Sequence, residues 1–189
     1  MRYQLIDELE AYQPFNEQEE KDRRLIINAL KTEDDIFLRK NLLYHMTASA
    51  WVVNKTRDKA LMAYHNIYNS WAWLGGHADG EADLLKVALK EVEEESGLTN
   101  ISPVTSKIFS VEVLVVDGHM KNKEYVSSHL HFNVTYLIEA DEKEKLIVKE
   151  DENSNLSWFS LEEAVEASTE PWLKENIYVK MNEKLKRMK

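Results

Sequence analysis

The sequence predicts an α/β protein in which helices pack on a mixed β-sheet. Short strand-like stretches precede a helical stretch in the middle of the chain, and the same order is repeated in the second half, which favours helices layered on a sheet. The chain has 189 residues, a length typical of one domain with an appendage. Its hydrophobic content of 43% is enough for a packed core.

The first 43 residues predict a helical, highly charged extension. Asn16 followed by Glu19 resembles a capping box at the start of a helix. A modest apolar stripe follows at Leu25, Ile26, Ala29 and Leu30. We expect a structural extension, and docking on the domain, dimerisation and shielding of an active site stay open as its roles.

The remaining elements follow from local patterns of apolar and turn residues. Strands are expected over residues 47–54, 59–65, 71–74, 107–116, 129–139 and 156–159. Loops are expected at 117–119 and over the charged run 141–152, and helices over 161–167 and 172–187.

The most informative stretch is an amphipathic helix after the glycine turn at residues 75–76. Its buried stripe is predicted from the helical spacing of Leu85, Ala88, Leu89 and Val92. Asp83 near the start suits the positive end of a helix, and Gly97 is a suitable C-terminal cap. Leu98 can then pack back onto the last turn.

Three carboxylates share one face of this helix. Glu91, Glu94 and Glu95 have the spacing that brings side chains together. Like charges this close repel, and a divalent cation relieves the repulsion. Oxygen ligands suit Mg²⁺ or Mn²⁺. Taken alone, such an acidic run is more often a solvated surface.

The segment resembles the Nudix box of the Nudix hydrolases, G-x5-E-x7-R-E-U-x-E-E-x-G-U, with U aliphatic. Seven of the nine constrained positions match, namely Gly76, Glu91, Val92, Glu94, Glu95, Gly97 and Leu98. Ala82 stands in place of the first glutamate, although Glu81 and Asp83 flank it and one could reach inward. Lys90 stands in place of the arginine, keeping the charge without the planar fork.

The resemblance implies a Nudix-type α/β/α sandwich, with the division 1–43 for the extension and 44–189 for the Nudix domain. It extends over about residues 47–185 and is similar to a bacterial group whose box begins GGHADG. That group also carries a V-D-G-H turn, here at 116–119, and an S-S-H-L-H strand, here at 127–131.

The resemblance further implies divalent-metal-dependent hydrolysis of a diphosphate bond in a nucleoside diphosphate linked to another moiety. Glu91, Glu94 and Glu95 would bind Mg²⁺ or Mn²⁺ and carry the catalysis, with the carbonyl of Gly76 as a further ligand. The general base would be a box glutamate or a loop acid among Glu150, Asp151 and Glu152. The alternative is a degenerate module that binds a nucleotide or metabolite without turnover. Isomerase chemistry on this fold uses a cysteine, and the chain has none.

Histidines are the candidate substrate contacts. His77 follows the glycine turn, where it could hold the turn or contact a substrate phosphate. His129 and His131 alternate with apolar residues, and they and the following Asn133 and Thr135 either face water or line a pocket. Tyr68, Trp71 and Trp73 could stack on a base, but core packing is favoured for them.

Composition narrows the partners. The net charge of −10 is unfavourable for binding a nucleic-acid backbone. The sequence lacks both a long apolar run and a signal-peptide pattern, so we expect no membrane partner. The lack of cysteine is compatible with the cytoplasm, the expected location. We expect a small-molecule partner, and homodimerisation is left open.

Overall fold

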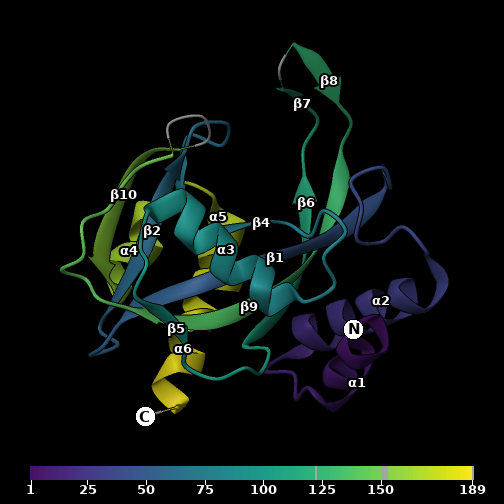
Figure 1. Cartoon of the computed structure of the whole chain (residues 1–189), viewed down its shortest axis with the longest axis horizontal. Helices are drawn as coiled ribbons and strands as arrows, with labels where there is room; N and C mark the ends of the chain where they lie inside the picture. The colour runs from purple at the N-terminus through teal and green to yellow at the C-terminus, as the bar shows by residue number, and fades with distance from the viewer. Residues whose placement is uncertain (122, 150–152, 189) are drawn as a thin grey trace.

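The computed structural model describes residues 1–121, 123–149 and 153–188, which form a mixed sheet with helices around it (Figure 1). The helices are α1 (Arg2–Ala11), α2 (Glu17–Thr32), α3 (Leu84–Ser96), α4 (Leu161–Ala167), α5 (Pro171–Leu173) and α6 (Val179–Arg187), with a π-helical turn η1 (Lys174–Tyr178) before α6. The strands are β1 (Tyr44–Asn54), β2 (Lys59–His65), β3 (Ser70–Ala72), β4 (Leu74–His77), β5 (Ile101–Pro103), β6 (Ser110–Val116), β7 (His119–Lys121), β8 (Glu124–Val126), β9 (His129–Ala140) and β10 (Asn153–Ser160).

The main sheet is built around the long strands β1 and β9. They run parallel to each other from Tyr44↔Leu130 to Asn54↔Ala140. The order β10-β2-β1-β9-β5 forms the path of the sheet, and β3, β4 and β6 pair with β2, β1 and β9. These other pairings are antiparallel, so the sheet is mixed, as predicted.

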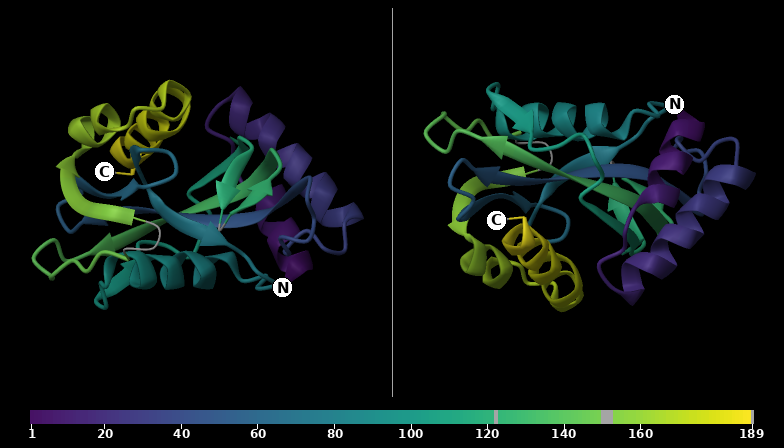
Figure 2. Two further views of the ribbon diagram at one scale, coloured as in Figure 1. Left: turned by 90° about the horizontal axis from the view of Figure 1, so that it is seen from above. Right: turned by 90° about the horizontal axis from the view of Figure 1, so that it is seen from below.

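Helices cover both faces of the sheet (Figure 2). Side chains alternate along β1, and Met46 and Ala48 join the apolar cluster that includes the inner face of α3. Trp51 and Val53 point the other way, into a second cluster with residues of α4, η1 and α6. The predicted α/β/α sandwich is therefore confirmed.

The N-terminal extension docks on the domain, one of the roles left open by the sequence. Leu5 and Leu9 of α1 and Leu30 of α2 belong to the same buried cluster as the inner face of α3. The side chain of Asn16 accepts a hydrogen bond from the backbone N–H of Glu19 at 3.0 Å, as predicted. The Glu19 carboxylate departs from the expected capping box, because it accepts from the N–H of Phe15 and turns into the core.

The apolar stripe of α2 is narrower than predicted. Ile26, Ala29 and Leu30 are buried, but Leu25 is 54% exposed and lies outside the core contact. Leu25 faces solvent because contact with the sheet determines which face of α2 is buried.

Two strand predictions were wrong in detail. The single strand expected at 71–74 is two strands, because the chain changes partner at Trp73: β3 pairs with β2 and β4 with β1. The loop expected at 117–119 instead leads into the hairpin β7–β8, which projects from the sheet in Figure 1. Pairing of β7 with β8 depends on the register of the two strands, and the polar sequence of this segment does not indicate that register.

Within residues 1–121, 123–149 and 153–188, every helix falls short of the length and apolarity needed to cross a bilayer.

Candidate functional site

Helix α3 holds the acidic residues in a fixed frame. Asp83 caps its first turn by accepting a hydrogen bond from the N–H of Lys86 at 3.1 Å. Gly97 ends it in the left-handed region at φ 72°, a conformation that favours glycine. Ala88 and Val92 are fully buried, and Leu98 packs into the same core, as predicted. The carboxylates at the C-terminal half of α3 are thus presented from a rigid element.

Glu91 lies directly against the backbone of Gly76. A Cβ atom added to Gly76 would lie 2.5 Å from the carboxyl carbon of Glu91, so a larger residue would displace this carboxylate. The Glu91 side chain is 13% exposed. The structure therefore brings together two residues that the sequence assigned to one metal site.

Glu95 is the most deeply fixed of the three carboxylates. It is 5% exposed, and its Oε2 accepts a hydrogen bond from the N–H of Gly75 at 2.9 Å. Its Oε1 accepts from Nδ2 of Asn153, at the start of β10, at 3.0 Å. The sequence analysis missed Asn153, because nothing local to it indicates contact with a residue 58 positions away.

Glu94 lies on the solvent side of the same helix. Its side chain is 42% exposed and its Oε1 lies 3.0 Å from Nζ of Lys90. The same ammonium group is 4.0 Å from Glu91, so Lys90 lies next to two of the three carboxylates. The hydrogen bond to Glu94 raises the pKa of Lys90, which therefore stays charged. A set of carboxylate oxygens with a nearby backbone carbonyl fits Mg²⁺ or Mn²⁺.

Neither residue beside Ala82 replaces the missing glutamate. Glu81 accepts hydrogen bonds from Nζ of Lys86 at 2.7 Å and from the N–H of Asp83 at 3.0 Å. Asp83 is occupied by capping α3.

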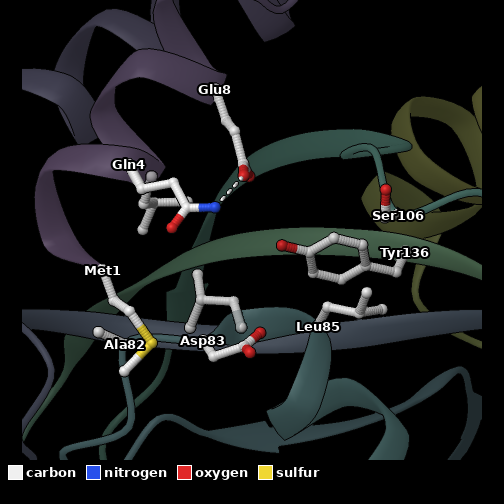
Figure 3. Close-up of a pocket in the computed structure, with 10 residues that line it drawn as sticks. Met1, Gln4, Glu8, Ala82, Asp83, Leu85, Ser106 and Tyr136 are labelled. Atoms are coloured by element: carbon white, nitrogen blue, oxygen red, sulfur yellow. Dashed lines mark hydrogen bonds between the residues drawn. The ribbon is translucent and has the colours of Figure 1, made fainter.

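Ala82 itself lines a cavity of about 240 Å³ at the N-terminal end of α3 (Figure 3). The cavity is also lined by residues of α1, including Met1, Gln4 and Glu8, and by Tyr136 of β9. It lies at the opposite end of the helix from Glu91 and Glu95, so position 82 faces the extension.

Four histidines gather on the other face of β4. His45, His77 and His131 each place one ring nitrogen within 4.8 Å of the other two. Nε2 of His129 lies 3.2 Å from Nε2 of His131. The three predicted contacts, His77, His129 and His131, are thus neighbours. His45 was missed because the strand was predicted to begin at Thr47, whereas β1 begins at Tyr44.

Burial keeps two rings of this cluster, His45 and His131, uncharged. Desolvation, together with the nearby imidazoles of His77, His45 and His129, lowers the pKa of His131 to about 2. Burial also lowers the pKa of His45, which is 4% exposed. Both rings are therefore neutral near pH 7 and keep a nitrogen lone pair.

The polar residues that follow on β9 serve the interior. Asn133 and Thr135 are fully buried and both donate to the carboxylate of Glu112, at 3.0 Å. They neither face water nor line a pocket, so both alternatives were wrong for these two residues. Trp71 and Trp73 pack against the second core cluster, as favoured, whereas Tyr68 is 40% exposed. The proposed loop acids Glu150, Asp151 and Glu152 lie outside the described residues.

Comparison with known proteins identifies the family. The family model described as NUDIX domain matches residues 43–180, and the chain therefore belongs to the Nudix family. Among curated proteins, none matches. Membership supports the general diphosphate-hydrolysing chemistry of Nudix enzymes.

Solved structures share the fold at low sequence identity. An Ap4A hydrolase from C. elegans has a TM-score of 0.52 at 14% identity, covering 76% of this chain and 96% of that chain. A hydrolase of the NUDIX family from Clostridium perfringens has a TM-score of 0.51 at 23% identity, covering 77% and 98%. A MutT protein from Methanosarcina mazei Go1 has a TM-score of 0.51 at 17% identity, covering 78% and 96%.

Proposed function

We propose that the chain is a divalent-metal-dependent hydrolase that cleaves a diphosphate bond in a nucleoside diphosphate linked to another moiety. The observation that carries this proposal is the arrangement of Glu91 and Glu95 against the glycines of β4. Glu91 fills the space beside Gly76, and Glu95 accepts a hydrogen bond from Gly75. Gly76, Glu91 and Glu95 belong to the Nudix box, which is expected to act on the diphosphate in a member of the family.

Glu91, Glu94, Glu95 and the carbonyl of Gly76 would hold Mg²⁺ or Mn²⁺. A bound ion of this kind neutralises phosphate oxygens and lowers the pKa of a bound water. Hydrogen bonds from Gly75 and Asn153 hold the Glu95 carboxylate in one orientation, which is the role of supporting contacts around a metal ligand.

Glu94 is the carboxylate best placed to accept a proton from the attacking water. Its side chain is the most exposed of the three, at 42%, whereas both oxygens of Glu95 already accept hydrogen bonds. Lys90, 3.0 Å from Glu94, would orient this carboxylate and attract the anionic substrate.

His77, His129 and His131 are proposed to contact the part of the bound substrate that extends past β4, on the side away from the three carboxylates. Each is partly exposed, and His77 directly follows Gly76 in the chain. A neutral imidazole can donate one N–H and accept one hydrogen bond, which suits a phosphate oxygen or a ribose hydroxyl.

Further parts of the proposal rest on the sequence. They are membership of the bacterial GGHADG group, the division into residues 1–43 and 44–189, and a cytoplasmic location. A small nucleotide derivative is the proposed partner, and a homodimer is compatible with the proposal.

The departures at Ala82 and Lys90 favour one second candidate, a module that binds a nucleotide or metabolite without turnover. One experiment distinguishes hydrolysis from binding without turnover. Wild-type protein is incubated with nucleoside diphosphate derivatives and Mg²⁺ or Mn²⁺, and products are separated by ion-exchange chromatography. A nucleoside monophosphate and a phosphorylated second product support the hydrolase. Saturable binding of the same compounds by calorimetry, with all of the substrate recovered intact, supports the binding module and contradicts the hydrolase.

A further inference from the structure

The four clustered histidines come from three strands that are distant in sequence. His45 lies on β1, His77 on β4, and His129 and His131 on β9. The register places His45 directly beside His131 in the parallel β1–β9 pair and His77 beside Thr47 in the β1–β4 pair. Ring centroids are 5.1 Å apart for His45 and His77, and 4.8 Å apart for His77 and His131.

This cluster is separate from the carboxylate site. A Cβ atom added to Gly76 would point at the side chain of Glu91 on α3. Successive residues of a strand project to opposite faces, and His77 accordingly contacts His45 and His131. The imidazoles and the carboxylates therefore lie on the two sides of β4.

The hydrogen bonds of His45 and His129 each leave Nε2 of the ring with a lone pair. A carbonyl only accepts, so Nδ1 of His45 donates to the carbonyl of Asn41, at 3.0 Å. The remaining nitrogen of His45, Nε2, is buried and has no hydrogen-bond partner among the described residues. Nδ1 of His129 likewise donates to the carbonyl of Ser127, at 2.8 Å, which leaves its Nε2 as an acceptor.

Such a contact from the distal ring nitrogen to a carbonyl is how proteins orient histidines that bind metals. A buried acceptor without a partner is costly, and a bound cation would satisfy it. The two charged groups that act on the cluster, Arg39 and Asp79, form an ion pair with each other. Asp79 raises the pKa of His45, but burial outweighs this effect and the pKa of His45 is lowered overall.

We propose that His45, His77 and His131 bind a late first-row transition-metal ion such as Zn²⁺, with His129 as the neighbouring fourth imidazole. Imidazole nitrogen suits this class of ion, whereas Mg²⁺ prefers oxygen. Tetrahedral coordination with bonds of about 2.0–2.1 Å requires nitrogens about 3.3 Å apart. The separation of 3.2 Å between Nε2 of His129 and Nε2 of His131 already matches this, and the ligand atoms of His45, His77 and His131 lie within 4.8 Å of one another, so a bound ion would draw these three rings closer together.

The cluster is open on one side, because His77, His129 and His131 are only partly buried. An ion can therefore enter from solvent. A cation bound there would also present to an anionic ligand the positive charge that neutral imidazoles lack.

The test uses Co²⁺, whose visible absorption reports its coordination. Untagged full-length protein is titrated with Co²⁺ in excess Mg²⁺, which occupies oxygen sites and leaves imidazole sites free. We expect one equivalent to bind with the intense visible bands of four- or five-coordinate cobalt, and Zn²⁺ to displace it. His131→Gln and His77→Gln are each expected to weaken binding at least tenfold.

Two controls separate this site from other sites on the chain. His119→Gln changes a histidine of the β7–β8 hairpin whose Nδ1 makes the same kind of contact, to the carbonyl of Asp117 at 2.9 Å. Glu94→Gln changes the carboxylate site. Both are expected to bind Co²⁺ as the wild type does, so that failure of the hydrolase proposal would leave this result intact.

The proposal is overturned if the wild type gives no intense visible band. It is also overturned if folded His131→Gln and His77→Gln, checked by circular dichroism, bind Co²⁺ as tightly as the wild type. Either result would mean that the four rings form a hydrogen-bonded cluster without a metal.

Discussion

Replacing Glu19 with glutamine should destabilise the whole fold, although the residue lies in the N-terminal extension. Glu19 is fully buried and its Oε1 lies 2.7 Å from Nζ of Lys184 and 3.3 Å from Nζ of Lys180. Its carboxylate also accepts hydrogen bonds from Tyr12 and Ser110, both at 2.7 Å. The variant would leave the buried Lys180 and the largely buried Lys184 with one fewer counter-charge.

The size of the effect follows from the pKa of this carboxyl group. Burial alone would raise it, but the ammonium groups of Lys180 and Lys184 outweigh burial and hold the pKa of Glu19 at about 2, below its ordinary 4.5. At about 1.4 kcal/mol for each pKa unit, this corresponds to about 3 kcal/mol of stability at pH 7. Breaking a buried ion pair costs a similar amount, roughly 3–5 kcal/mol.

Urea unfolding followed by circular dichroism measures this loss. Because the pKa is lower in the folded protein, the stabilisation is complete above about pH 4.5 and is lost as the pH falls toward 2. The difference in unfolding free energy between wild type and Glu19→Gln should therefore be largest at neutral pH and shrink in acid.

Glu17→Gln is the matched control, since Glu17 lies on the same helix and pairs with Lys21 in solvent. Its unfolding midpoint should equal that of the wild type. If Glu19→Gln were as stable as Glu17→Gln at pH 7, or if its deficit did not change with pH, the buried ion pairs would not stabilise the fold.

Three further predictions follow from the site and its helix. Asn153→Ala removes a hydrogen-bond donor to Glu95 and should weaken Mn²⁺ binding about 10–100-fold by paramagnetic titration, with unchanged affinity counting against its supporting role. Gly97→Ala forces alanine to φ 72° and places its Cβ 2.7 Å from Cβ of Ile147. The free energy of unfolding measured in urea should therefore fall by roughly 1–2 kcal/mol, and an unchanged value would contradict this prediction. Ala82→Glu should change the hydrolysis rate less than about twofold, because position 82 faces the cavity beside α1, and a large gain would mean that the missing glutamate limits catalysis.

Helix α3 could be predicted from the sequence because its signals are local. The cap at Asp83, the stop at Gly97 and the spacing of the glutamates all fall within one short segment. The contact of Glu91 with Gly76 followed from the family resemblance, and the structure explains it by the lack of a side chain at position 76.

Contacts between distant strands and helices could not be predicted in the same way. His45 joins His131 through the register of a parallel strand pair, which a sequence pattern does not define. Lys180 and Glu19, 161 positions apart, look like surface charges in sequence because each lies in a charged helical segment. Only packing of the extension against α6 reveals that they are buried together.

The most direct test of the proposed function compares neighbouring glutamates of α3. Diphosphate hydrolysis with Mg²⁺ and with Mn²⁺ would be measured for the wild type, Glu95→Gln and Glu93→Gln. Glu93 is exposed and lies outside the constrained positions of the box, so it controls for loss of charge on the same helix. We expect metal-dependent turnover that falls at least about 100-fold in Glu95→Gln and is retained in Glu93→Gln. Equal turnover in the two variants, or no turnover by the folded wild type across the substrate panel, would contradict the proposed metal-dependent hydrolysis.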